Sequence, residues 1–212
     1  MHDTALFGGS LFGKIYGTKG MKVLDVGGQD VNGSLRDPLS KLCELEYISM
    51  DIEEGKGVDV ICKPGQPFPF PDGHFDLVVS TSCFEHDPCF WMTFREIGRV
   101  VKKDGFIYMN APSQGMYHTY PGDNWRFYSD AGQALAYWSG KVLDGACYPV
   151  TVVETFHILP YNDQWVDFVC VWRRCDEKEE HITVTDAVRN YIGPLQASIH
   201  ASNMKTVNIF TQ

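Results

Sequence analysis

Acidic residues and glycines stand directly after two short apolar runs of the chain. Asp25, Gly27 and Gly28 close the first run, MKVLDVGG, and Asp51 closes the second, LEYISMDI. A pair of glycines lets a ligand approach the backbone closely, and a carboxylate at the end of a second strand can accept both hydroxyl groups of a ribose. These residue types at this spacing predict a nucleoside-binding site.

The spacing of the glycines indicates which class of nucleoside cofactor the site can bind. A dinucleotide fingerprint needs glycines at positions 27, 29 and 32, where the chain has Gly27, Gln29 and Asn32. The backbone cradle for a pyrophosphate is therefore missing, and NAD and FAD are not expected.

Groups that can move a proton follow further along the chain. His86 stands after Glu85, just before a predicted helix, and His118 and Asp123 lie in the polar and aromatic connection 112–128. A histidine titrates near neutral pH and a carboxylate can hold or relay a proton, so these two histidines and Asp123 are the candidate catalytic residues. His118 is favoured, because such connections commonly bind substrates. For His86, packing at the start of a helix is an equally good explanation.

The same connection carries side chains that suit the binding of a substrate. The candidates are Tyr117, Tyr120, Trp125 and Arg126. A guanidinium can fork onto a carboxylate or phosphate. Two alternatives stay open: Trp125 packs in the core, and Arg126 forms an internal pair with Asp123 or Asp130.

Short apolar runs bounded by turn residues predict the strands that position these groups. Most are rich in β-branched residues, as expected of strands buried on both faces. The predicted strands are 21–28, 45–52, 58–62, 75–81, 106–111, 150–156 and 165–172.

One helix is predicted between the fourth and fifth strands. Pro88 suits a first helical turn, and apolar residues recur at helical spacing from Phe90 to Val101. Two cations and a glycine are expected to end it: Lys102, Lys103 and Gly105.

A second helix is predicted from Ser129 toward Gly140, before the last two strands. Strands that alternate with helices predict an α/β fold, in which a mostly parallel sheet has helices on both faces. Ligands of such sheets bind at the carboxyl ends of the strands, where the residues named above stand.

The length of 212 residues predicts one domain with a sizeable core. We assign residues 1–175 to this domain, with 1–20 as a lead-in, and 176–212 to an extension that packs on the domain or on a subunit partner. Within the extension we expect a solvated turn at 176–180, a short helix at 184–195 and an edge strand at 205–211.

Composition narrows the function classes. The chain has 27 acidic against 18 basic side chains, a formal net charge of -9. Such a balance argues against nucleic acid and membrane surfaces as partners. No apolar run reaches the roughly 18 residues of a spanning helix and no signal peptide is recognisable, so a cytoplasmic protein is expected. The seven scattered cysteines predict reduced thiols.

Five stretches of the chain, in order, resemble the class I S-adenosylmethionine-dependent methyltransferases, and most closely a type 11-like branch that acts on small molecules. They are VLDVGGQDVNGSLR, YISMDIEEGKGVDVI, FDLVVSTSCFEHDP, REIGRVVKKDGFIYMNAPS and YHTYPGDNWRFY. The resemblance covers about residues 21–172. It implies a Rossmann-like sheet of seven mostly parallel strands with the last strand antiparallel.

The resemblance also implies which residues hold S-adenosylmethionine. Asp25 with Gly27 and Gly28 would hold its amino-acid portion. The second-strand carboxylate would hold the ribose hydroxyls. The remaining contacts would come from Ile52 on the adenine face, Cys62 and Lys63 at the adenine edge, and Ser80 and Thr81 beside the sulfonium.

Two positions depart from the family's pattern. Gln29 replaces a glycine and is expected to place a side chain near the methionine end of the cofactor, and Lys63 replaces the acidic residue that commonly meets the adenine amino group. Weaker or altered adenine recognition would follow. We expect no metal, because Ser82 stands where methyltransferases of related pattern that bind one have a first glutamate, although Glu85, His86 and His118 could supply part of such a set.

The resemblance implies an enzyme that methylates an oxygen, or as a less favoured alternative a nitrogen, of a small metabolite or sugar-like acceptor. An inactive methyltransferase fold that serves in binding or assembly is the competing interpretation, and a homodimer is compatible with either. In-line transfer from a sulfonium requires mainly that the acceptor be aligned and its proton removed.

Overall fold

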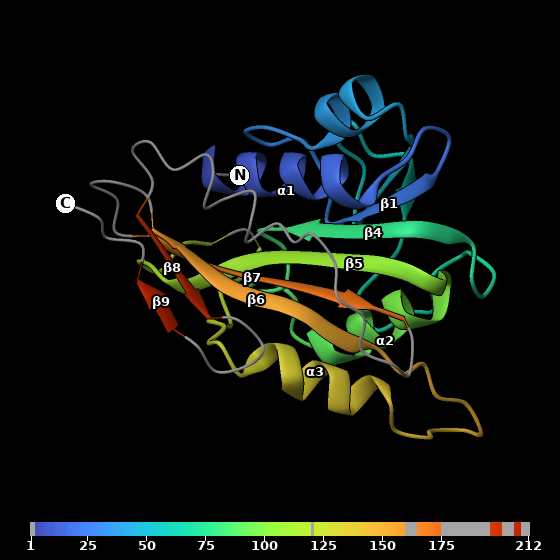
Figure 1. Cartoon of the computed structure of the whole chain (residues 1–212). Helices are drawn as coiled ribbons and strands as arrows, with labels where there is room; N and C mark the ends of the chain where they lie inside the picture. Colours follow the sequence, from blue (N-terminus) through green and yellow to red (C-terminus); the bar gives the residue numbers. More distant parts are fainter. Residues whose placement is uncertain (1–2, 120, 160–164, 175–195, 201–205, 209–212) are drawn as a thin grey trace.

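A central sheet organises the protein in this computed structural model, which describes residues 3–119, 121–159, 165–174, 196–200 and 206–208. Its strand order is β3-β2-β1-β4-β5-β7-β6-β8-β9 (Figure 1). The strands are β1 Lys22–Val26, β2 Glu46–Asp51, β3 Val60–Ile61, β4 Phe75–Thr81, β5 Val101–Gln114, β6 Thr151–Leu159, β7 Val166–Arg173, β8 Gln196–His200 and β9 Thr206–Asn208.

The first seven strands confirm the predicted Rossmann-like sheet. β3, β2, β1, β4 and β5 pair in parallel. β7 inserts between β5 and β6 and is antiparallel to both, so the last of the seven strands reverses as predicted. β8 and β9 continue the sheet in antiparallel pairing beyond β6, and β9 lies within the predicted edge strand 205–211. The predicted turn at 176–180 and helix at 184–195 lie outside the described residues.

Burial on both faces explains why the parallel strands are apolar runs. Adjacent residues of a strand point to opposite faces. Val23 and Leu77 pack in the cluster on one face, whereas Leu24 and Val78 pack in the cluster on the other. The two faces therefore have separate cores.

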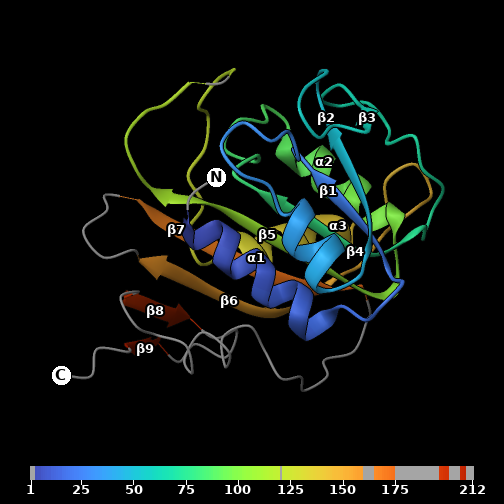
Figure 2. The same cartoon turned by 90° about the horizontal axis from the view of Figure 1, so that it is seen from above.

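Helix α1 (Asp3–Tyr16) covers one face of the sheet, as Figure 2 shows, together with the short helical segment η1 (Pro38–Leu42). We predicted only a lead-in over 1–20. Its three glycines weaken any prediction of this helix from residue propensities, since glycine is a weak helix former. Their packing gives the reason for them: a Cβ at Gly8 would lie 2.5 Å from the Tyr108 hydroxyl of β5.

Helices α2 (Phe90–Val100) and α3 (Ala131–Ser139) lie on the opposite side of the sheet from α1 (Figure 1). Helices on both faces were predicted. α3 begins two residues later than its predicted start at Ser129 and ends before Gly140 as expected, although Asp130 makes no side-chain hydrogen bond at its start.

The predicted end of α2 was wrong. Val101, Lys102, Lys103 and Gly105 belong to β5, so the chain passes from helix to strand without a loop. The Lys102 ammonium lies 2.6 Å from the Asp76 carboxylate of β4. A Cβ at Gly105 would lie 2.6 Å from the Asp76 carbonyl oxygen, so this glycine serves the close approach of two strands rather than a helix cap.

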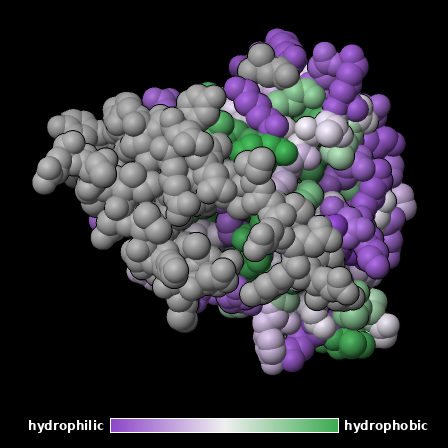
Figure 3. Space-filling view, viewed as in Figure 1, coloured by the Kyte–Doolittle hydropathy of each residue, from purple (hydrophilic) through white to green (hydrophobic). Residues whose placement is uncertain are grey.

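The surface and the thiols are consistent with the composition. In the view of Figure 3, many hydrophilic side chains cover the described surface, with hydrophobic ones scattered between them. None of the described helices is long and apolar enough to cross a membrane. The six cysteines within the described residues are free thiols, as predicted for them.

The packing of α1 predicts a stability effect. Phe12 is fully buried, with ring centroids 5.1 Å from Tyr16 and 5.2 Å from Tyr108. Phe12→Ala should lower the free energy of unfolding by about 3 to 5 kcal/mol in denaturant titration, because it leaves a cavity. Leu6→Ala, on the partly exposed side of the same helix, should cost no more than about 1 kcal/mol. Equal losses in the two variants would mean that α1 is not part of the core.

Candidate active site

One cavity of about 580 Å³ opens at the carboxyl ends of the parallel strands. The loops that follow β1, β2, β3 and β4 line it, together with residues of the connection after β5 and of β7. This is the edge at which a parallel sheet places its ligands, and the predicted site residues come mainly from the same loops.

The turn after β1 is held against β2. The N–H groups of Gly27 and Gly28 both donate to the Met50 carbonyl oxygen, at 2.9 and 3.2 Å. Gly27 has a φ of +76°, and a Cβ there would collide with the Cys83 sulfur atom. The turn therefore needs glycine for its conformation and for its contact with the loop after β4.

Asp25 lies beneath this turn with its carboxylate out of solvent. The Tyr47 hydroxyl donates to its Oδ2, whereas Oδ1 has no hydrogen-bond partner among the described residues. Burial raises the pKa of Asp25 to about 7, and the nearby Asp51 charge adds to the rise. An incoming donor or positive charge in the cavity would satisfy the free oxygen.

Asp51, at the end of β2, is oriented by backbone donors. Gln29 N–H donates to its Oδ2 at 3.0 Å and Ile52 N–H to its Oδ1 at 2.7 Å. A carboxylate has about four acceptor positions, so capacity remains for two further donors. The Gln29 side chain lies against Gly55 in the loop after β2, which differs from the methionine-end position that we expected.

The other predicted cofactor residues divide into two groups. Ile52, Cys62, Lys63 and Thr81 line the cavity, and the side chain of Lys63 is exposed. Ser80 is buried outside the lining, where its hydroxyl donates to the Val26 carbonyl at 2.8 Å. Its side chain thus ties β4 to β1.

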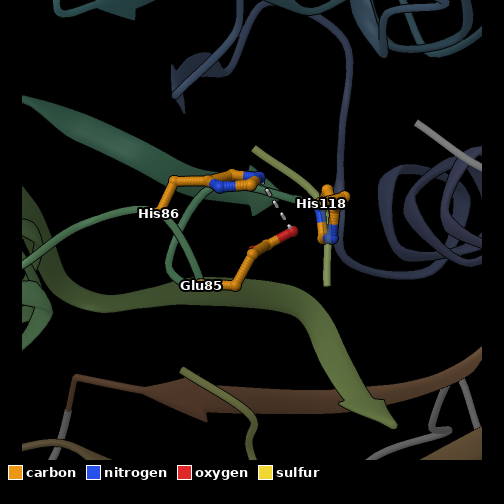
Figure 4. A group of neighbouring side chains, drawn as sticks. All are labelled: Glu85, His86 and His118. Carbon is orange, nitrogen blue, oxygen red and sulfur yellow. Dashed lines mark ion pairs between the residues drawn. The ribbon is translucent and has the colours of Figure 1, made fainter. Parts of the chain in front are cut away.

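Glu85, His86 and His118 also line the cavity, and their side chains lie close together (Figure 4). His86 Nε2 lies 3.5 Å from Glu85 Oε1, and the two imidazole rings are perpendicular with centroids 4.9 Å apart. Glu85 is 1% exposed, and its Oε2 has no hydrogen-bond partner among the described residues. Burial raises the pKa of Glu85 to about 8 and lowers the pKa of His86.

Asp123 holds the histidine of the long connection in place. It accepts the backbone N–H of His118 at 2.9 Å, and its Oδ2 lies 3.3 Å from His118 Nδ1. Both guanidinium Nη groups of Arg126 donate to the same carboxylate, which lowers the pKa of Asp123 to about 2. Of the two explanations for Arg126, the internal pair is the one found.

The predicted substrate residues do not gather in the cavity. Trp125 donates its indole N–H to the Asp87 carbonyl at 2.8 Å and packs on Phe90, which favours the packing explanation. Tyr117 is 76% exposed and does not line the cavity. Tyr120 lies outside the described residues.

Trp165 and Asp167 are among the lining residues that were not predicted. Both come from the start of β7, and the Trp165 ring meets His118 edge to face at 4.9 Å. Asp167 is buried and accepts a hydrogen bond from the Thr4 hydroxyl of α1. Asp167 could have been noticed in the sequence as an acidic residue inside an otherwise apolar strand, since carboxylates are rarely buried without a partner.

The comparisons with known proteins agree with this geometry. A family model described as a methyltransferase domain matches residues 24–109. No curated protein matches the chain in sequence. The matched stretch contains the glycine turn, Asp51 and the Glu85–His86 pair.

Solved methyltransferases share the fold at low sequence identity. One is a 1,6-didemethyltoxoflavin-N1-methyltransferase of Burkholderia thailandensis with bound S-adenosylhomocysteine, at 13% identity and a TM-score of 0.57, covering 82% of this chain and 80% of that one. Another is an S-adenosylmethionine-dependent methyltransferase of Methanosarcina mazei, at 15% identity and a TM-score of 0.53, covering 76% of this chain and 96% of that one.

The burial of Asp25 predicts a pH effect on stability. Its pKa rises from 3.8 to about 7 on folding, so the carboxyl's contribution to stability is present below the unfolded pKa and is lost as the pH rises through 7. Asp25→Asn removes this loss. In denaturant titration, the free energy of unfolding of the variant minus that of the native chain should therefore rise by on the order of 2 to 3 kcal/mol from pH 5 to pH 8.

Asp76→Asn is the matched control. Burial alone would raise the pKa of Asp76, but the hydrogen bonds from the Lys102 side chain and the Lys22 N–H, together with the charges of both lysines, lower it, so this carboxylate is ionised throughout that pH range. Its effect on stability should be the same at both pH values. If the stability difference between Asp25→Asn and the native chain is the same at pH 5 and pH 8, the raised pKa of the buried Asp25 is contradicted.

Proposed function

We propose that the protein is a class I S-adenosylmethionine-dependent methyltransferase that methylates an oxygen, or less favourably a nitrogen, of a small metabolite or sugar-like acceptor. The match of residues 24–109 to a methyltransferase domain and the fold shared with solved methyltransferases support the proposal. One observation carries the proposal. The glycine turn, Asp51 and the Glu85–His86–His118 cluster all line one cavity. Groups that suit a nucleoside and groups that can move a proton would thus share the space in which a methyl group would move.

The proposed cofactor contacts follow the family's pattern. Asp25 and the Gly27–Gly28 turn would hold the amino-acid portion, and the free oxygen of Asp25 supports a contact with its ammonium group. Asp51 would accept both ribose hydroxyls with the acceptor positions that its backbone donors leave unused. Ile52, Cys62 and Lys63 would border the adenine. Gln29 and Thr81 also line this cavity, and Ser80 would contribute only backbone groups.

The chain's own residues would align the acceptor and help its proton leave. When bound, S-adenosylmethionine supplies a methyl group on a sulfonium, which transfers by in-line displacement. His118 and His86 are the proposed groups that face the acceptor. Asp123 stays ionised at neutral pH because Arg126 neutralises it, so its proposed role is to orient His118 rather than to accept a proton.

The proposed domain spans residues 1–175 and includes α1 as a structural part. Pairing of β8 with β6 supports the proposal that the extension 176–212 packs on the domain. The formal net charge of -9 supports a small-molecule acceptor rather than nucleic acid, because an acidic chain repels a phosphate backbone.

Cofactor binding gives the direct test of the proposal. S-adenosylmethionine at about 100 times its dissociation constant should stabilise the fold by about 2.7 kcal/mol, a melting shift of roughly 5 to 10 °C for a chain of this size. Asp51→Ala should weaken the affinity in calorimetry about ten- to a hundredfold, since it removes a charge-assisted bidentate contact.

Asp37→Ala, which removes an exposed carboxylate outside the cavity lining, should bind the cofactor as the native chain does. A melting shift with NAD and none with S-adenosylmethionine would overturn the proposal. Binding that Asp51→Ala leaves unchanged would overturn the ribose contact.

His118→Ala tests the proposed contact with the acceptor. Once a labelled-methyl screen of cell-extract metabolites has identified an acceptor, the variant should lower turnover by roughly 10² to 10⁴ with nearly unchanged cofactor affinity. If His118 only orients the acceptor, the loss falls on KM instead. Tyr117→Ala, an exposed neighbour, is the control and should leave both constants as they are. Intact constants in His118→Ala would shift the proposed role to His86.

A further inference from the structure

We propose that Glu85, His86 and His118 bind one divalent cation in the cavity. Each residue can offer one ligand atom, and these atoms lie within 4.8 Å of one another. Neighbouring ligand atoms that share an ion at roughly 2.1 Å lie about 3.0 to 3.4 Å apart, so the side chains would have to draw together by up to about 1.8 Å when the ion binds. Figure 4 shows the three side chains turned toward a common space.

The hydrogen bonds of the two histidines leave the correct nitrogens free. His86 Nδ1 contacts the carbonyl oxygen of Gly122, and His118 Nδ1 faces the Asp123 carboxylate at 3.3 Å. Both partners can only accept, so each Nδ1 carries the proton and each Nε2 keeps its lone pair. Metal-binding histidines characteristically donate their second ring N–H to a carbonyl or carboxylate, which fixes the tautomer and the ring orientation.

The third ligand is a buried carboxylate whose charge has no dedicated cation. Glu85 is 1% exposed, its Oε2 lacks a hydrogen-bond partner among the described residues, and the nearby guanidinium of Arg126 is engaged by Asp123. An isolated buried carboxylate is costly. A divalent cation between Glu85 and the imidazoles would satisfy the free oxygen and supply the missing positive charge.

The backbone holds the three ligands on one frame. Asn124 N–H and Trp125 N–H donate to the Glu85 carbonyl at 2.7 and 3.1 Å, and the Asn124 side chain donates to the His86 carbonyl at 2.9 Å. The connection that carries His118 is thereby tied to the segment that carries the other two ligands. Such a frame is what a preorganised site requires.

Two imidazoles and one carboxylate favour a particular class of ion. This donor set suits Mn²⁺, Fe²⁺, Co²⁺ or Zn²⁺ better than Mg²⁺ or Ca²⁺, and it leaves coordination positions open toward the cavity. Resting on the proposed function, the open positions would hold an acceptor oxygen and ease the loss of its proton, as a bound cation does for water. The two histidines would then help the acceptor to lose its proton indirectly, by binding the ion.

The expectation of no metal rested on Ser82, which offers no carboxylate. The proposed site uses no ligand at that position, because Glu85, His86 and His118 already bring three ligand atoms together. The ligand set is thus one glutamate and two histidines.

The test is metal binding by the full chain after dialysis against a chelator. Titration with Mn²⁺, Zn²⁺ and Co²⁺, followed by calorimetry and by the visible absorption of Co²⁺, should show one site. Glu85→Gln and His118→Ala should each weaken binding by at least about tenfold, because losing a supporting partner of a ligand alone has that effect. His74→Ala, which removes a histidine outside the cavity lining, is the control and should bind the ion normally.

S-adenosylmethionine binding, measured on the same preparations, shows that each variant is folded and separates the two proposals. A chain that binds the cofactor but none of the three ions, or variants that bind an ion as tightly as the native chain, overturns the metal site and leaves the methyltransferase proposal intact. A chain that binds the ion at this cluster but not the cofactor supports the metal site and overturns the proposed function.

Discussion

The hydrogen bonds from Gly27 N–H and Gly28 N–H to the Met50 carbonyl are the constraint on which the site depends. They hold the turn after β1 on the end of β2, so the carboxylates of Asp25 and Asp51 reach the same cavity from neighbouring strands. The parallel pairing of β4 with β1 then brings the Glu85 segment to the same edge. Without this turn, the part of the cavity that suits a nucleoside would lose its shape.

Two buried carboxylates line the cavity in the same electrostatic state. Asp25 and Glu85 each keep one carboxylate oxygen without a partner among the described residues, and burial raises the pKa of both. Asp123, by contrast, is neutralised by Arg126 and serves as a fixed support. Such unsatisfied groups destabilise the fold, and they stand where a cofactor ammonium group and a cation would bind. The fold is thus less stable because of these groups, and we expect bound ligands to compensate for the loss.

The lining around Glu85 and the two histidines is built from segments that are remote in the chain. Glu85 and His86 follow β4, His118 follows β5, and Trp165 and Asp167 begin β7. The antiparallel insertion of β7 beside β5 brings the last two to the cavity, and the hydrogen bond between Asp167 and Thr4 extends the link to α1. The helix that we took for a lead-in therefore supports a lining residue as well as the core.

The sequence alone determined the sheet of seven strands and most of its strand positions, because apolar runs bounded by turn residues are local patterns. Tertiary structure decided what depends on contacts between distant segments. Arg126 was ambiguous until Asp123 was seen to neutralise it, and glycines concealed α1 because their reason is packing on Tyr108 and its neighbours. Gly105 resembled a helix cap because its strand partner, Asp76, lies 29 residues earlier in the chain. Glu85, His86 and His118 could be named from the sequence, but only folding placed the Nδ1 atom of His86 on the Gly122 carbonyl and that of His118 beside the Asp123 carboxylate.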